Sequence, residues 1–185
     1  MIDLRQKPII EGEKIILRPF KTADFPYIEE CLKDAEVIKL TGSTSDRVRD
    51  TVLDWYNTRN DQMDRLDLAI VDKSQDILVG EVVLNLYDAE SNSMNYRILI
   101  GPRGRNRGLG TEATEQMIDY AFQNMKLDQV TLSVYEFNPR ARSVYEKVGF
   151  VLESIDENEL EFEGEGIDSI NMKLTREVWS SKKRR

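Results

Sequence analysis

The chain has 185 residues, of which 40% are hydrophobic and 32% are charged, with a formal net charge of −8 and no histidine. This composition is typical of one folded domain, and it excludes a disordered chain, a Ser-His-Asp triad, a Cys-His pair and a histidine-ligated metal site. The acidic balance argues against general nucleic-acid binding, so we expect neither a metal nor a nucleic-acid partner.

The segments that read as secondary structure begin with a strand at residues 14–18. Thr22 is expected to cap a helix over residues 23–33, with Pro26 in its first turn. Cys31, the one cysteine, falls in the apolar pattern of this helix. It is therefore expected to be a core residue without a catalytic role.

A second helix is expected to start at Ser45 or Asp46 and to run to about Thr58. Two β-rich runs follow, at residues 67–71 and 78–86, on either side of the turn-like stretch DKSQD. This pattern predicts a β-hairpin. No apolar run approaches the roughly 20 residues that a membrane span needs, and the first residues lack the apolar core of a signal peptide. We therefore expect a cytoplasmic protein with no membrane partner.

The second half of the chain alternates in the same way. Residues 94–100 alternate so that Met94, Tyr96, Ile98 and Ile100 share one face of a strand. The remaining expected elements are an amphipathic helix at 110–124, a strand at 129–135, a helix at 138–147 closed by Gly149, strands at 150–154 and 168–174, and a short terminal helical turn in REVW.

The stretch RGRNRGLGTEA, residues 103–113, lies between the strand that ends at Ile100 and the following helix. A glycine-rich turn at the start of a helix presents backbone N–H groups and the positive end of the helix dipole, which together bind phosphate. A P-loop is excluded because the required lysine is missing. A dinucleotide-binding turn fits Gly108 to Ala113, but it lies too far from its strand and too few residues follow it. The remaining alternative is a loop with solvated arginines.

A second segment decides between these alternatives. Arg105 to Gly110 has the form R-x-x-G-x-G, and NPRARSVYEKVGF follows at residues 138–150. Together these segments resemble the two acetyl-CoA segments of the GNAT superfamily of N-acetyltransferases. ILRPF near the start, Gly80-Glu81, Asp168 and LTREVW resemble the branch that includes ribosomal-protein N-terminal and polyamine acetyltransferases. The resemblance covers residues 13–179 of a single domain and leaves a basic tail at 181–185.

The resemblance implies an α/β fold with a mixed, mostly antiparallel central sheet whose central strands splay and are flanked by helices. It implies acetyl-CoA as cosubstrate, with the pyrophosphate on the glycine turn and the pantetheine arm between strands 94–100 and 129–135. Arg105 is favoured over Arg103 as a ligand because it occupies the motif position. The expected cofactor-binding residues are Leu99, Ile100, Arg105, Asn106, Arg107, Gly108, Leu109, Gly110, Thr111 and Asn138.

Two residues are the catalytic candidates. Tyr145 falls at the family's tyrosine position, and the resemblance implies that it protonates the leaving thiolate, although packing beside Val144 and Val148 is an alternative. Glu81 interrupts the apolar run LVGEVVL and is the leading general base, although an outward-facing strand glutamate has the same pattern. A backbone N–H near Leu99 is expected to polarise the thioester carbonyl.

The predicted activity is transfer of an acetyl group from acetyl-CoA to a primary amine by direct attack in a ternary complex. The acceptor is expected to be a protein N-terminal amine. The alternatives are a polyamine or other small cationic amine, or a non-catalytic acetyl-CoA-binding sensor. The acidic segment 156–168 reads as a loop in which Glu161 or Glu163 either attracts the amine or simply faces solvent. A homodimer is left open.

Overall fold

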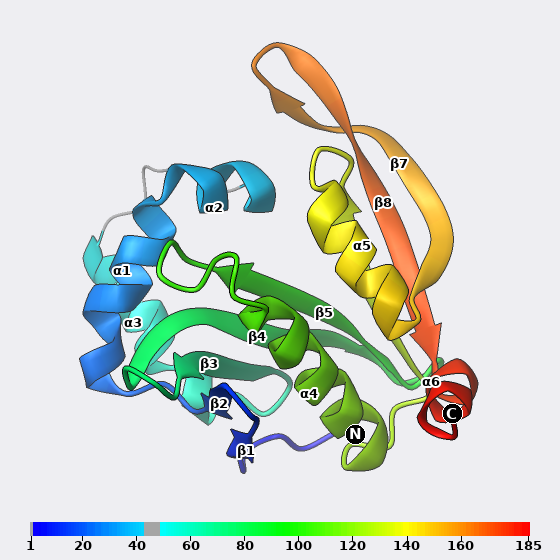
Figure 1. The fold of residues 1–185 in the computed structure, drawn as a ribbon, viewed down its shortest axis with the longest axis horizontal. Helices are drawn as coiled ribbons and strands as arrows, with labels where there is room; N and C mark the ends of the chain where they lie inside the picture. The colour runs from blue at the N-terminus through cyan, green and yellow to red at the C-terminus, as the bar shows by residue number, and fades with distance from the viewer. Residues whose placement is uncertain (1, 43–48) are drawn as a thin grey trace.

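The computed structural model describes residues 2–42 and 49–185, and an eight-stranded sheet organises them (Figure 1). The strand order is β1-β2-β3-β4-β5-β6-β8-β7. Every neighbouring pair is antiparallel except β5 and β6, which run parallel. The strands are β1 (Ile10–Glu11), β2 (Ile15–Arg18), β3 (Leu66–Asp72), β4 (Ile77–Asp88), β5 (Ser93–Ile100), β6 (Gln129–Tyr135), β7 (Val151–Phe162) and β8 (Glu165–Thr175).

Helices pack on both faces of this sheet. They are α1 (Phe25–Lys33), α2 (Ala35–Thr41), α3 (Arg49–Asn57), α4 (Leu109–Gln123), α5 (Pro139–Val148) and α6 (Arg176–Lys183). Successive residues of a strand point to opposite faces, so the strands divide their side chains between two cores. Leu68 of β3 joins the core with Met117 of α4, whereas Ala69 joins the core with Cys31 and Tyr56. The predicted mixed, mostly antiparallel α/β fold with flanking helices is confirmed.

The two central strands part after a short common stretch. β5 pairs with β6 only where Ser93, Met94 and Asn95 lie beside residues 129–131. Beyond that stretch β5 stays paired with β4 as far as Ile100, and β6 stays paired with β8 as far as Tyr135. Figure 1 shows the two halves of the sheet diverging from the region near α6. The sheet therefore opens into a V between β5 and β6, as the predicted splay requires.

Most elements expected from the sequence are present, but the start of the first helix is different. Thr22 does not cap it; Thr22 lies in a 3-10 turn (Thr22–Asp24) that precedes α1. The buried Asp24 carboxylate accepts hydrogen bonds from the Lys21 N–H at 2.7 Å and from Arg18 at 2.8 Å. A carboxylate that ties the chain to β2 thus takes the place of the expected threonine cap.

The second expected helix corresponds to α3, whose expected start at Ser45 or Asp46 lies outside the described residues. Two short elements, β1 and α2, are not predicted. Cys31 is a free, buried cysteine, as expected, and burial raises the pKa of its thiol to about 12.

The acidic segment 156–168 is not a loop. It forms the outer parts of β7 and β8, a long hairpin that projects from the domain in Figure 1. Glu163 and Gly164 make its turn, with φ of 52° and 81°. The common two-residue hairpin turns require positive φ in this way. The side chains of β7 are largely solvent-exposed, so its charges need no burial, and the pairing with β8 supplies the backbone hydrogen bonds.

Candidate active site

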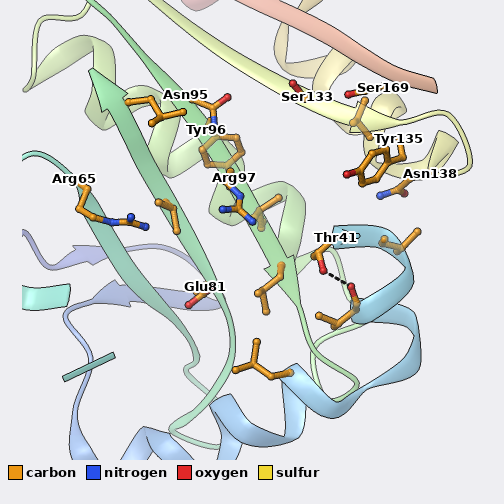
Figure 2. A pocket seen from close by; sticks show the side chains of 18 of the residues that line it. Thr41, Arg65, Glu81, Asn95, Tyr96, Arg97, Ser133, Tyr135, Asn138 and Ser169 are labelled. Carbon is orange, nitrogen blue, oxygen red and sulfur yellow. Dashed lines mark hydrogen bonds between the residues drawn. The ribbon is translucent and has the colours of Figure 1, made fainter. Parts of the chain in front are cut away.

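A cavity of about 900 Å³ lies at the opening between β5 and β6 (Figure 2). α1, α2 and α3 form one side of it, β4 and β5 form its floor, and β6, α5 and β7 form the opposite side. Representative lining residues are Leu32, Val37, Tyr56, Glu81, Arg97, Leu99, Tyr135, Tyr145 and Asp156. The cavity therefore brings together side chains from most of the elements on which the sequence analysis drew.

Glu81 lies in the floor of this cavity. Its neighbours in the sheet are Ala69 of β3 and Leu99 of β5. Burial raises the pKa of the Glu81 carboxyl to about 7, against the opposing effects of the Tyr56 hydroxyl and the positive charges of Arg97 and Arg65. A carboxyl with this pKa is ionised in about half of the molecules at neutral pH, which suits a general base.

Tyr145 enters the cavity from the opposite side. Its ring packs edge-on against Tyr96 at 6.4 Å and against Phe150 at 6.0 Å, so its packing partners include residues other than the Val144 and Val148 considered from the sequence. Burial raises the pKa of the Tyr145 phenol to about 12. Within the described part of the chain, no hydrogen bond joins this hydroxyl to another residue. The phenol is therefore protonated at neutral pH and can donate to a bound group.

The end of β5 presents backbone groups to the opening. In a strand, alternate peptide groups point to each of the two neighbouring strands. β4 occupies one edge of β5 along its length, whereas β6 pairs with the other edge only as far as Asn95. Peptide groups between Tyr96 and Ile100 that point away from β4 are consequently available to a ligand. Leu99 also contributes to the cavity wall, whereas Ile100 packs against the α4 core.

The glycine turn leads directly into α4. Gly108 is the N-terminal cap of α4 and has a φ of 75°, a conformation that glycine adopts without strain. The Glu112 N–H bonds to the Gly108 carbonyl at 3.2 Å, and the preceding N–H groups of the first turn have no partner within the helix. A Cβ on Gly108 would meet no atom within 4 Å. The turn thus presents an accessible set of N–H groups at the positive end of a helix.

The three arginines of this turn are each held by carboxylates. Arg103 pairs with Glu30 at 2.9 Å, and Arg107 pairs with the buried Asp72 at 2.7 Å. Arg105 pairs with Asp34, the residue that caps α2, and with Glu36 at 2.9 Å. These side chains fix the turn against α1, α2 and β3.

The two segments that carry the resemblance meet in space. Arg140 of α5 donates a hydrogen bond to the Asn106 side chain of the glycine turn. Asn138 caps α5 by accepting from the Ala141 N–H at 3.2 Å, and it also lines the cavity. Asn138 therefore caps α5, and its position is compatible with a ligand contact as well.

The hairpin reaches back across the structure to α2. The Lys39 ammonium lies 5.0 Å from the ring centre of Phe137 and 5.5 Å from that of Phe162, near the hairpin tip. Asp156 and Glu159 of the same hairpin line the cavity, whereas the predicted Glu161 and Glu163 are not among its lining residues. The acidic charge of the cavity rim thus comes from a different part of the segment than expected.

Three polar residues of the cavity were not singled out from the sequence. Arg97 had no readable signal, because it lies on the face of β5 opposite to the apolar one, where a charged residue is ordinary. Tyr56 and Arg65 had none either, since they come near Glu81 only through the packing of α3 and of the residue that precedes β3. Across the described ranges, no cluster of three or more Cys, Asp or Glu side chains could hold a metal ion. In the same part of the chain, none of the helices is both long and apolar enough to cross a membrane.

Comparison with known proteins is consistent with this geometry. Residues 14–151 match the model of the acetyltransferase (GNAT) domain. An N-acetyltransferase 9-like protein of Caenorhabditis briggsae is 26% identical over 160 residues, 80% of this chain and 79% of the relative. A spermidine N(1)-acetyltransferase of Escherichia coli K12 is 26% identical over 162 residues, 87% of this chain and 86% of the relative. The crystal structure of a Vibrio cholerae spermidine N-acetyltransferase with CoA and spermine superimposes with a TM-score of 0.83 at 22% identity, over 91% of this chain and 99% of that one.

Proposed function

Since the chain belongs to the acetyltransferase (GNAT) family and is an acetyl-CoA-dependent N-acetyltransferase, we propose that its acceptor is the α-amine of a peptide or protein N-terminus. The observation that carries this proposal is the pKa of Glu81, which burial raises to about 7. An α-ammonium group has a pKa of about 8, whereas an alkylammonium such as that of lysine has one of about 10.4. Glu81 therefore removes the proton of an α-amine at a smaller free-energy cost.

The cosubstrate is proposed to lie along the opening between β5 and β6. Acetyl-CoA supplies an activated thioester whose carbonyl carbon is open to attack. N–H groups between Arg105 and Thr111 hold its pyrophosphate, because they stand at the positive end of α4. The arginine side chains of this turn pair with protein carboxylates and hold the turn in place. Backbone groups of Leu99 and Ile100 and the side chain of Asn138 hold the part nearer the thioester.

Three groups of the chain then act on the reacting atoms. The ionised Glu81 carboxylate accepts a proton from the acceptor ammonium and leaves a neutral amine. A backbone N–H of β5 near Leu99 that points away from β4 donates a hydrogen bond to the thioester oxygen as the C–N bond forms. Tyr145 donates its phenolic proton to the sulfur as the C–S bond breaks, the nitrogen loses its second proton to solvent as the amide forms, and Tyr145 recovers a proton from solvent. Glu81 releases its proton to solvent, which balances the cycle.

A polyamine or other small cationic amine is the second candidate acceptor. Asp156 and Glu159 line the cavity and attract ammonium groups, and relatives at 26% identity are spermidine acetyltransferases. This candidate differs from the first in needing a stronger base or a water relay, because its amines are more basic.

The test is CoA thiol release with a panel of acceptors at equal concentration. A peptide with a free N-terminus, the same peptide with an acetylated N-terminus, and spermidine form the panel. We expect release with the free peptide, none with the blocked peptide, and a lower kcat/KM with spermidine. A higher kcat/KM with spermidine would replace the first candidate with the second, and acetyl-CoA binding without any release would assign a sensor.

A further inference from the structure

The cavity floor carries positive charge beside the proposed base. In the pairing of β4 with β5, Glu81 lies opposite Leu99 and Val83 lies opposite Arg97. Glu81 and Arg97 are therefore diagonal neighbours on one face of the sheet, with Cα atoms about 7–8 Å apart. Figure 2 shows the side chains of Arg97 and Arg65 in the same cavity as Glu81.

Arg97 differs from the other arginines of the site. Arg103, Arg105 and Arg107 are each paired with a protein carboxylate. Arg65 makes two hydrogen bonds to the buried Asp67, at 2.6 and 2.8 Å. Considering residues 2–42 and 49–185, no ion pair or hydrogen bond engages the Arg97 guanidinium, which is solvent-exposed at the cavity wall.

The charges that face the cavity form two zones. Asp156 and Glu159 stand on the hairpin side and attract the ammonium end of an acceptor. Arg97 and Arg65 line the cavity together with Glu81, and Arg65 is paired with Asp67. A polyamine that extended over the floor would place a second ammonium group against Arg97. An acceptor with a carboxylate would instead find an unpaired guanidinium, which binds carboxylates through two parallel hydrogen bonds.

We propose that Arg97 binds a carboxylate of the acceptor, so that the enzyme prefers α-amines that carry an acidic group within one or two residues. This inference rests on the proposed function, because it assumes an amine at Glu81. The diagonal spacing of Glu81 and Arg97 corresponds to about two residues of extended chain, which matches an N-terminal amine followed by an acidic side chain. A free α-amino acid also carries an amine and a carboxylate, and these two groups lie closer together than in the peptide.

The experiment uses three peptides with blocked C-termini that differ only in their second residue, which is aspartate, asparagine or lysine. Free alanine is the fourth acceptor and separates an amino acid from a peptide as the source of the carboxylate. For the unmodified enzyme we expect kcat/KM to be about tenfold higher with the aspartate peptide than with the asparagine peptide, and lower still with the lysine peptide. A higher kcat/KM with free alanine than with all three peptides would mean that the acceptor is an amino acid, and it would still support binding of the acceptor carboxylate by Arg97.

Arg97→Gln removes the charge and keeps a polar side chain. It is expected to reduce the ratio of kcat/KM between the aspartate and asparagine peptides from about ten to about one, and any change common to both peptides reflects the loss of the Arg97 charge beside Glu81. Arg97→Lys should keep part of the preference. Arg5→Gln is the control, because Arg5 is exposed and pairs with Asp3 away from the cavity.

Two outcomes would overturn the inference. Equal rates of the unmodified enzyme with all three peptides would remove the carboxylate anchor and leave the proposed function intact. An equal loss with every acceptor in Arg97→Gln, together with a shift of the pH profile, would mean that Arg97 acts only on the pKa of Glu81. The absence of turnover with every amine would instead reject the proposed function itself, and the inference with it.

Discussion

Tyr56 and Glu81 line the same cavity and each acts on the pKa of the other, although the two residues belong to α3 and β4. Burial raises the pKa of Tyr56 well above its usual value, so its hydroxyl keeps its proton at neutral pH. The Tyr56 hydroxyl in turn favours the ionised form of Glu81 and limits the rise in pKa that burial causes. The pKa of this buried base thus lies near 7 because two effects oppose each other.

The first prediction concerns Glu81→Gln. Since burial raises the pKa of Glu81 to about 7, the carboxylate is lost as the pH falls below 7, and the kcat/KM of the unmodified enzyme should fall with it. The variant should lose about 10²- to 10⁴-fold in kcat/KM at pH 8 and should show no acidic limb near pH 7. Steady-state kinetics between pH 5.5 and 9 measure both. The exposed Glu161→Gln is the matched control, and an acidic limb that survives in Glu81→Gln would assign the base elsewhere.

The second prediction separates chemistry from packing at Tyr145. Tyr145→Phe keeps the ring that packs on Tyr96 and Phe150 and removes only the hydroxyl. We expect kcat to fall about ten- to a thousandfold, with little change in acetyl-CoA affinity or Tm. Kinetics, calorimetric titration and thermal unfolding are the three measurements. An unchanged kcat would mean that water or another residue donates the proton. A large fall in Tm with a proportionate loss of activity would mean that Tyr145 acts through packing.

The third prediction concerns the glycine turn. Gly108 has a positive φ, so valine there would strain the fold and confuse the result. A Cβ on Gly110 would lie at an ordinary 3.4 Å from the Ile100 side chain, so Gly110→Val should fold. It should weaken acetyl-CoA binding at least about tenfold by obstructing the N–H groups. Ala89→Val adds comparable bulk in the turn at the opposite end of β4 and β5 and should bind normally. Normal acetyl-CoA affinity in folded Gly110→Val would reject the phosphate cradle.

The fourth prediction concerns the acidic rim. Glu159 lines the cavity and Glu157 does not, although both lie on β7. Glu159→Gln should raise KM for a cationic amine a few-fold at low ionic strength, because it removes an attraction that salt screens. At about 0.5 M salt the variant and the unmodified enzyme should converge, as the KM of the unmodified enzyme rises. Glu157→Gln should change little, and an equal effect of both substitutions would indicate only the general charge of the hairpin.

The sequence was most informative where one element determines the pattern. The alternation of Met94, Tyr96, Ile98 and Ile100 predicted the buried face of β5, because period-two burial is a local property of a strand. The stretches α2 and β1 were missed because seven and two residues are too short for a periodic signal. The hairpin was misread because its charged residues face solvent on both sides, and its turn at Glu163 and Gly164 was not recognised.

The site was predictable in part for the same reason. Glu81 and Tyr145 stand out within their own segments, as a charge in an apolar strand and as a motif position. Tyr56 and Arg97 gain their meaning only when α3 and β5 lie against Glu81, which no local pattern records. The arginines of the glycine turn show the same limit, since Asp34 and Asp72 lie about 70 and 35 positions away in sequence.

The opening between β5 and β6 also makes backbone amides report on the cosubstrate. Amides of residues 96–100 that point away from β4 have no strand partner to protect them, whereas those of residues 93–95 lie in the paired part of the sheet. Hydrogen–deuterium exchange should therefore be fast at the first set and slow at the second in the free protein. Acetyl-CoA should slow exchange in the first set and leave the second unchanged. The splay thus divides β5 into a half whose amides are protected by the sheet and a half whose amide exchange changes when acetyl-CoA binds.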